Sequence, residues 1–387
     1  MSNLFSSDDL TESQDHIYYD LSISNSHSIN ELEPHLTFNE TRTTAIIEKP
    51  EQYKLSIVRF MVDTHCLPVM QPTIMSQSDQ TFYFKSWEID LNRTAYSITI
   101  QHGATVMMNY VNFEPQDTTI GIPQGFMPDG SIDYSTGYYN IYSYDHFVTL
   151  CNNTIRNILS AVILAYPTSS ALPTLYYDGN KMSFQVPESA WDSSDNTDYK
   201  IFFNTATYRL FNSLPAKHLN KKDVLGRHFQ LDTANFSNNM ALVTNYHTLD
   251  GSVINPTGIT FLSITQEHST TANWSPVSSI AFTTDSLNVV GSHVSSLHEF
   301  DHGREIIEGS NSNSITMITD LTTGDYLPGV LYNPSGEYRW VDLTASGPIK
   351  KINVNVYWIS KLAAVNPFKL SAGGSCSLKL LFQKKNI

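Results

Sequence analysis

The sequence predicts an all-β protein built as a single jelly-roll sandwich, and three observations lead to this fold class. Short runs of alternating apolar and polar residues recur along the 387 residues, and a period of two is typical of strands with one buried face. Clusters of Gly, Pro, Asn and Ser separate these runs. Only one segment has helical spacing. We therefore expect an antiparallel sandwich or jelly roll with an inserted or upper region that contains one amphipathic helix.

Two of these strand-like runs lie at the end of the given sequence. The apolar positions of the first run are Ile352, Val354, Val356 and Trp358. Those of the second run are Leu378, Leu380 and Phe382. Asn366-Pro367 and Gly373-Gly374 lie between them, so the two runs form a hairpin or are joined by a longer corner. In a jelly roll the last strand usually lies beside an early one, and we expect the second run to face the sandwich interior.

Further strands are predicted along the chain. They are IYYDLSIS from Ile17, YKLSIVRFMV from Tyr53, TFYFKSWEI from Thr81, AYSITIQHG from Ala95, YKIFFNTA from Tyr199, GITFLSIT from Gly258, SSIAFTT from Ser278, NSITMITDL from Asn313 and EYRWVDL from Glu337. A hairpin is expected in PTLYYDGNKMSFQVP, because Gly179 can take the positive φ of a tight turn.

One helix is predicted in SYDHFVTLCNNTIRNILSAVILAYP, with Ser143 or Asp145 as its cap and Pro167 as its stop. Its apolar face contains Phe147, Cys151, Ile155, Ile158, Leu159 and Val162. The polar face is mainly Asn and Thr and lacks the basic residues that membrane binding favours. We expect this helix to pack on a sheet.

These patterns suggest three parts of the chain. An acidic N-terminal arm covers residues 1–15, a discontinuous jelly-roll domain covers 16–112 and 267–387, and an inserted or upper region covers 113–266.

Charge and composition limit the partners. The net charge is −14, and the basic residues are scattered, so direct binding to nucleic acid is not expected. Only 16% of the residues are charged, against roughly 25% in a typical soluble domain, which suits a protein that buries much of its surface in an assembly. The first residues lack the apolar core of a signal peptide, and no apolar run approaches the roughly 20 residues of a membrane span. We expect synthesis in the cytosol.

The three cysteines predict no cofactor or disulfide framework. Cys66, Cys151 and Cys376 lie far apart and form no C-x-x-C pair, so small buried thiols are expected.

The string His298-Glu299-Phe300-Asp301-His302 matches H-E-x-x-H, in which a helix places two His on one face for zinc. Gly303 directly follows the second His, and the extension that would supply a third ligand is absent. His298, Glu299 and His302 are therefore weak metal candidates, and a solvated loop is the main expectation. We name no catalytic residue.

Two alternatives to a purely structural protein stay open: a carbohydrate-binding sandwich and, with less support, a zinc hydrolase using the HEFDH segment. A lectin would use exposed tryptophans to stack on sugars, although a large aromatic on a strand is more often core. The candidates are Trp87, Trp191, Trp274 and Trp340.

Several stretches, in order along the chain, resemble the penton proteins, also called minor capsid proteins, of virophages and Polinton-like double-stranded DNA viruses. They are FNETRTTAIIEKPEQYKLSIVRFMVDTHCLPVMQP from Phe38, YYNIYSYDHFVTLCNNTI from Tyr138, YKIFFNTATYRLFNSLP from Tyr199, WSPVSSIAFTTDSLNVV from Trp274, SITMITDL with PSGEYRWVDL, and the C-terminal KKINVNVYWISKLAAVNPFKLSAGGSCSLKLLFQKKNI. The loop around His298 lies outside this resemblance.

The resemblance implies a jelly-roll subunit that forms a homopentamer at the icosahedral fivefold vertex of a virion. Double jelly-roll major capsid proteins would surround it. It implies no enzyme activity and no cofactor.

Overall fold

The structure is a computed structural model that describes residues 15–25, 35–64, 67–75, 92–116, 138–162, 173–188, 199–219, 222–232, 239–248, 252–290, 292–293, 298–301, 304–307, 316–322, 329–333, 338–361, 365–370 and 373–385. The chain divides into two compact units. One, the jelly-roll unit, comprises Met1–Leu67 and Pro276–Ile387, and the other, the inserted unit, comprises Pro68–Ser275.

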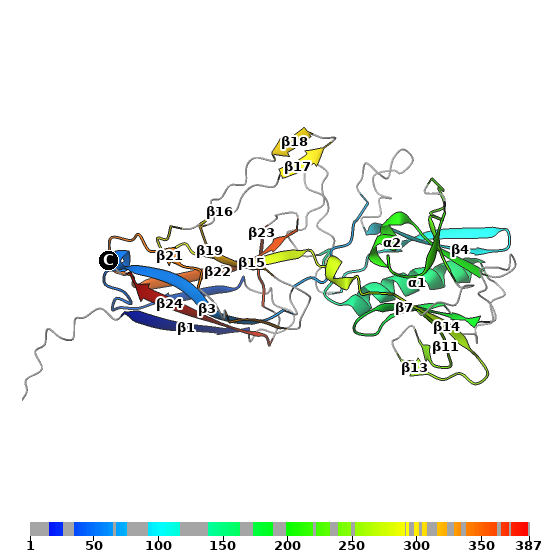
Figure 1. Ribbon diagram of the computed structural model, residues 1–387, viewed down its shortest axis with the longest axis horizontal. Helices are drawn as coiled ribbons and strands as arrows, with labels where there is room; N and C mark the ends of the chain where they lie inside the picture. Colours follow the sequence, from blue (N-terminus) through cyan, green and yellow to red (C-terminus); the bar gives the residue numbers. More distant parts are fainter. Residues whose placement is uncertain are drawn as a thin grey trace, which may run out of the picture. The chain divides into compact units, whose positions relative to one another are not determined.

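The jelly-roll unit contains two antiparallel sheets (Figure 1). The first has the strand order β1-β24-β3-β20, with β21 also paired to β3, and the second has the order β16-β19-β15-β22-β2, with β23 paired to β22. The first sheet consists of β1 (His16–Ser24), β3 (Tyr53–Asp63), β20 (Gly329–Tyr332), β21 (Val341–Asp342) and β24 (Ser375–Lys384). The second consists of β2 (Thr37–Thr41), β15 (Val277–Thr283), β16 (Ser292–His293), β19 (Thr316–Thr322), β22 (Lys351–Ser360) and β23 (Val365–Pro367). A 3₁₀ turn at Pro50–Gln52 precedes β3, and the two-stranded sheet of β17 (His298–Asp301) and β18 (Arg304–Ile307) is separate.

Alternating apolar residues of the two sheets form a single core between them. Phe60 of β3 meets Phe282 of β15 edge to face, with ring centroids 4.7 Å apart. Leu378, Leu380 and Phe382 are fully buried in the same core. The predicted orientation of the last strand is therefore confirmed.

The two terminal runs belong to different sheets. β24 lies between β1 and β3, whereas β22 lies between β15 and β2, so a corner and not a hairpin joins them. The expectation of one buried face on β22 was incomplete, because Asn353 and Asn355 are also buried. The connection after β15 covers them: Asn355 Nδ2 donates to Asp285 at 2.8 Å, and Asn353 N donates to Ser286 Oγ at 2.8 Å.

The inserted unit has two larger antiparallel sheets and a central helix. The sheet orders are β5-β4-β8-β10-β9 and β11-β14-β7-β6, and β12 pairs with β13. The first sheet consists of β4 (Arg93–His102), β5 (Thr105–Asn112), β8 (Tyr199–Phe203), β9 (Ala216–His218) and β10 (Phe229–Leu231). The others are β6 (Thr174–Tyr177), β7 (Met182–Pro187), β11 (Met240–Val243), β12 (Tyr246–His247), β13 (Val253–Ile254) and β14 (Phe261–Thr265). The helices are α1 (Tyr144–Val162), α2 (Thr205–Leu210) and a 3₁₀ turn at Thr271–Asn273.

The predicted amphipathic helix is α1, and it lies between the two sheets of this unit (Figure 1). The expected apolar residues Phe147, Cys151, Ile155, Ile158 and Leu159 are buried. Asn152 fixes the helix to β6, because its side chain accepts from Leu175 N and donates to Leu175 O, both at 2.9 Å. The structural role predicted for this helix is confirmed.

The expected boundary of the inserted region at residue 113 was wrong. β4 and β5 form a hairpin, and β4 pairs with β8 from His102↔Tyr199 to Ile98↔Phe203. This ladder places residues 93–112 in the inserted unit, whereas their alternation was compatible with either sheet. The predicted DGN hairpin is confirmed between β6 and β7. The proposed arm up to residue 14 and the strand predicted at 81–89 lie outside the described residues.

Candidate assembly and binding surfaces

The HEFDH segment is not helical where the structure describes it. His298–Asp301 forms β17 and pairs antiparallel with β18, with His298 opposite Ile307. An extended backbone does not give the helix face that H-E-x-x-H requires. The expected loop is thus a short hairpin, and His302 lies outside the described residues. Within the described ranges, no group of three His, Cys, Asp or Glu side chains is positioned to hold a metal ion.

Two of the cysteines are buried free thiols. Cys151 lies within α1 and Cys376 within β24. Burial raises the pKa of both thiols well above the ordinary range. Such protonated, enclosed thiols are poor nucleophiles and metal ligands. Cys66 lies outside the described residues.

The tryptophans give little support to sugar stacking. Trp274 is buried and packs edge to face against Tyr144, Phe147 and Phe211, with ring centroids 5.5–5.7 Å apart. Trp340 is half-buried, and Lys54 Nζ lies 4.4 Å from its ring centroid. Trp87 and Trp191 lie outside the described residues.

The outer face of the β1-β24-β3-β20 sheet carries charges in a cross-strand row. Asp20, Lys379 and Arg59 are adjacent in register. Both cations lie 3.1 Å from the Asp20 carboxylate. The next row contains Met61 and Leu331, which are 48% and 65% exposed. This face therefore combines solvated ion pairs with exposed apolar side chains, as protein interfaces commonly do.

A groove of about 560 Å³ lies on the outer face of the β5-β4-β8-β10-β9 sheet, and we call it the outer-face groove. Its lining residues are Gln101, Lys200, Phe202, Leu219, Lys222, Asp223, Val224, Arg227 and Gln230. Gln101 and Lys200 are cross-strand neighbours, and so are Phe202 and Gln230. The segment between β9 and β10 provides the remaining residues, so three strands and one loop build the groove.

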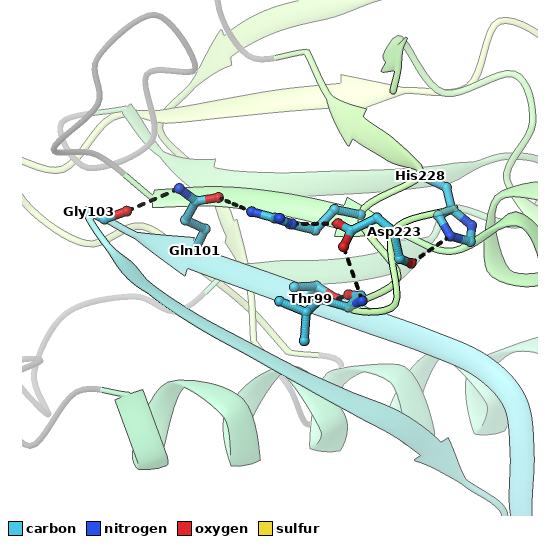
Figure 2. A network of polar contacts seen from close by, with 7 residues as sticks. Thr99, Gln101, Gly103, Asp223 and His228 are labelled. Carbon is cyan, nitrogen blue, oxygen red and sulfur yellow. Dashed lines mark hydrogen bonds and ion pairs between the residues drawn. The ribbon is translucent and has the colours of Figure 1, made fainter. Parts of the chain in front are cut away.

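A network of polar contacts fixes that loop against β4 (Figure 2). Thr99 Oγ1 donates to Leu225 O at 2.6 Å, and Arg227 donates to Asp223 at 2.6 Å and to Gln101 Oε1 at 3.3 Å. The Gln101 amide in turn donates to Gly103 O at 3.0 Å. The hydrogen bond from Arg227 lowers the pKa of Asp223, so this carboxylate stays ionised.

The same loop depends on a glycine. Gly226 has φ +69°, and a Cβ at this position would lie 2.8 Å from Ser97 Oγ. Only glycine permits both the left-handed backbone and the close approach to β4. No local pattern predicts this groove, because its residues come from positions 101 to 230. The glycine at position 226 is a local signal for the turn alone.

No helix in the described part of the chain is long and apolar enough to cross a membrane.

Comparisons with known proteins identify the family. The model of the Sputnik minor capsid protein V18/19 family matches residues 17–384. The structural protein V19 of Sputnik virophage is 22% identical over 216 residues, which are 55% of this chain and 95% of that protein. The uncharacterized protein V18 of the same virophage is 29% identical over 152 residues, covering 38% of this chain and 84% of V18.

Two solved structures share the fold. A chain in the 3.5 Å cryo-EM structure of Sputnik virophage has a TM-score of 0.75 at 23% identity, covering 96% of this chain and 99% of its own length. The mavirus penton protein has a TM-score of 0.56 at 15% identity, covering 96% and 100%. The jelly-roll expectation agrees with both likenesses. From the family match over nearly its whole length, the chain belongs to the Sputnik minor capsid protein V18/19 family and is a structural protein of a viral capsid.

Proposed function

We propose that this minor capsid protein is the subunit of a homopentameric penton that occupies the icosahedral fivefold vertices of its virion. The observation that carries the proposal is the likeness in fold to the mavirus penton protein, which spans 96% of this chain and the whole of that protein. Five copies of one heterologous contact between the two flanks of a subunit close into a ring. Such a role needs complementary surfaces and no catalytic group.

The remaining partners follow from this position. Double jelly-roll major capsid proteins would surround the ring and hold it in the shell. The outer face of the β1-β24-β3-β20 sheet, with its Asp20 row and the exposed Met61 and Leu331, offers one surface of mixed character for contacts within the capsid. The inserted unit would form the upper region of the vertex. The chain would be made in the host cytosol and would not contact the genome directly, consistent with its net charge of −14.

The test is the solution mass of the purified full-length protein, measured by light scattering over a concentration series. We expect one discrete species with five times the mass of the 43.5 kDa subunit. A species that stays monomeric at every concentration would contradict self-assembly of the ring.

We also propose that the protein acts without catalysis or bound metal. Zinc content measured on the same fractions should be far below one ion per subunit, in wild type and in His298→Ala alike. Stoichiometric zinc that is lost in His298→Ala would instead support the hydrolase alternative.

A further inference from the structure

Strand β1 forms one edge of the β1-β24-β3-β20 sheet and is drawn in dark blue in Figure 1. It pairs with β24 over nine residues in unbroken register. The edge strands β20, β2 and β16 of the same unit have only four, five and two residues. β1 contains no proline, lysine or bulge, which are common protections of an exposed edge. It therefore has the features of an edge that accepts a further strand.

The ladder to β24 fixes which backbone groups of β1 point to the free edge. At its two ends, Lys384 N donates to Asp15 O and Asn25 N donates to Gly374 O, both at 2.9 Å. Bonded pairs alternate in an antiparallel ladder, so the odd-numbered residues of β1 bond to β24. The N–H and C=O groups of the even-numbered residues point away from β24. Among the described residues, none forms a backbone hydrogen bond with these groups.

A groove of about 350 Å³ lies beside this edge, and we call it the edge groove. It is lined by residues 17–20 of β1 and by Arg42, Thr44, Ala45 and Ile46 of the segment after β2. The backbone of that segment is bonded to the second sheet, because Arg42 N donates to Lys350 O and Ile46 N donates to Ile349 O. The segment therefore forms the far wall of the edge groove and does not pair with β1.

The inward side chains along the edge are incompletely covered. Ile17 and Ile23 of β1 and Ile46 across the groove pack against the core but stay half-buried. An added strand would remove more of this apolar surface from water. Recognition through the backbone needs no net charge in the groove, where Arg42 already lies 3.4 Å from the Glu40 carboxylate. The edge groove thus suits an extended peptide.

The N-terminal arm is the segment of the chain that best fits this edge. Its residues 1–14, MSNLFSSDDLTESQ, directly precede the described part and contain no proline, so their backbone can form an uninterrupted ladder. Fourteen extended residues span up to about 46–50 Å, against roughly 30 Å for β1, which leaves enough chain to cross to another copy. Pairing within one copy would need a tight turn just before β1, yet residues 11–15 contain no Gly, Asn or Pro. A second copy is therefore the better source of the arm.

We infer that the N-terminal arm of one copy adds as a strand to the free edge of β1 in a neighbouring copy. The inference rests on the proposed homopentamer, in which each copy gives one arm and receives one. Five such exchanges would link the subunits of the ring in addition to the contacts between their flanks. The edge groove is then filled only in the assembled protein.

The test is site-specific photo-crosslinking of the full-length protein with p-benzoylphenylalanine in place of Phe5 or Leu10. Light scattering on the same sample first establishes its mass. We expect irradiation to join two chains, and mass spectrometry to map the cross-link to β1 or to residues 42–46 of the second chain. The control carries the same photoreactive residue in place of Val224, which is 88% exposed in the inserted unit, and should give no cross-link to β1.

A pair of double variants tests the backbone pairing itself. Tyr18→Pro with Ser22→Pro removes two N–H groups that point to the free edge, where an edge strand tolerates proline. We expect the yield of the cross-link to fall at least about fivefold, because two hydrogen bonds are lost. Tyr18→Ala with Ser22→Ala shortens the same side chains but keeps both N–H groups, so its yield should stay near that of wild type. Unfolding midpoints within about 5 °C of each other would exclude a general loss of folding.

The outcomes separate this inference from the proposed function. A pentamer whose cross-links map outside β1 and residues 42–46, or one with equal yields in both double variants, would overturn the arm exchange and leave the pentamer standing. Cross-links confined to single chains would overturn it as well, because the arm would then lie on its own copy. Protein that stays monomeric would overturn both proposals. The cross-link map of the protein with an unsubstituted β1 decides between these outcomes even if the proline variant does not fold.

Discussion

The outer faces of the sheets are covered to different extents in the two units of the chain. In the jelly-roll unit, the outer face of the β1-β24-β3-β20 sheet presents the Asp20 row to solvent, together with the exposed Met61 and Leu331. In the inserted unit, other segments lie over the sheets. The β9–β10 loop lies over β4, and Tyr246 of the short strand β12 stacks on Phe261 of β14 with ring centroids 4.9 Å apart. The first arrangement leaves a broad contact surface, whereas the second encloses a recessed groove.

Where a sheet is covered, its buried polar side chains need hydrogen-bonding partners within the protein. Every residue of β7 is buried, including Ser183 and Gln185, so both faces of this strand need partners. Gln185 accepts from His247 N at 2.9 Å and donates to Asn245 O at 3.0 Å. A polar side chain on a strand that is buried on both faces must therefore have a hydrogen-bonding partner within the protein, while the outward polar side chains of β24 can be solvated by water.

The largest effect is expected from the core of the jelly-roll unit. Phe382 is fully buried on the central strand β24, and Phe382→Ala should lower the free energy of unfolding by about 3 kcal/mol through the cavity that it leaves. Urea unfolding of this variant and of Gln383→Ala, a half-buried neighbour, measures the contrast. A loss below about 0.5 kcal/mol for Phe382→Ala would mean that β24 is not a core strand.

The next effect concerns the loop of the inserted unit. Gly226→Ala should cost about 2 kcal/mol, because the new Cβ adds both left-handed strain and a contact 2.8 Å from Ser97 Oγ. Gly258→Ala is the matched control, since Gly258 has φ +77° and nothing within 4 Å of its Cβ position. Urea melts should show the larger loss for Gly226→Ala. Equal losses of unfolding free energy in the two variants would show that the left-handed backbone accounts for the whole effect and that the close approach of Gly226 to β4 contributes nothing.

A smaller effect is expected at the open face of the jelly-roll unit. Asp20 is about half exposed and pairs with Arg59 and Lys379. Asp20→Ala should therefore cost only about 0.2–1 kcal/mol, and the difference should shrink in high salt. Asp20→Asn controls for size. A loss above about 2 kcal/mol that persists in high salt would show that this row holds the fold together and is not a solvated surface.

The smallest effect is a pH dependence in the inserted unit. Burial lowers the pKa of His247, which stacks on Tyr176 at 3.8 Å, although the charge of Asp178 acts in the opposite direction. The folded state then binds fewer protons than the unfolded state near the ordinary His pKa of about 6.5, so stability falls as the pH drops through that value. His247→Gln should make the unfolding midpoint depend less on pH. The control is His268→Gln at an exposed histidine, which should change the pH dependence less. Identical pH profiles for the two variants would contradict the assignment.

The sequence predicted the elements whose periodicity is strong and local. Leu378, Leu380 and Phe382 gave the orientation of β24, and Phe147, Cys151 and Ile155 gave the buried face of α1. Which strand pairs with which was harder to predict. The alternation from Ala95 predicted a strand but not that it pairs with β8, because period two gives the face of a strand and not its neighbour.

Local sequence patterns could not predict the residues of the outer-face groove. Arg227 and Gln101 meet at 3.3 Å although 126 positions separate them, so only the folded sheet brings them together. The HEFDH string shows the reverse problem. A short motif can match by chance, and the extended backbone of His298 and Glu299 differs from the helix that the chemistry needs.

The proposed penton role requires five copies of this capsid protein to form one closed ring. Negative-stain electron microscopy of the purified full-length protein tests it most directly, because class averages report both the number of subunits and their symmetry. We expect closed rings with fivefold symmetry. Particles of single subunits, or rings with a different number of copies, would contradict it.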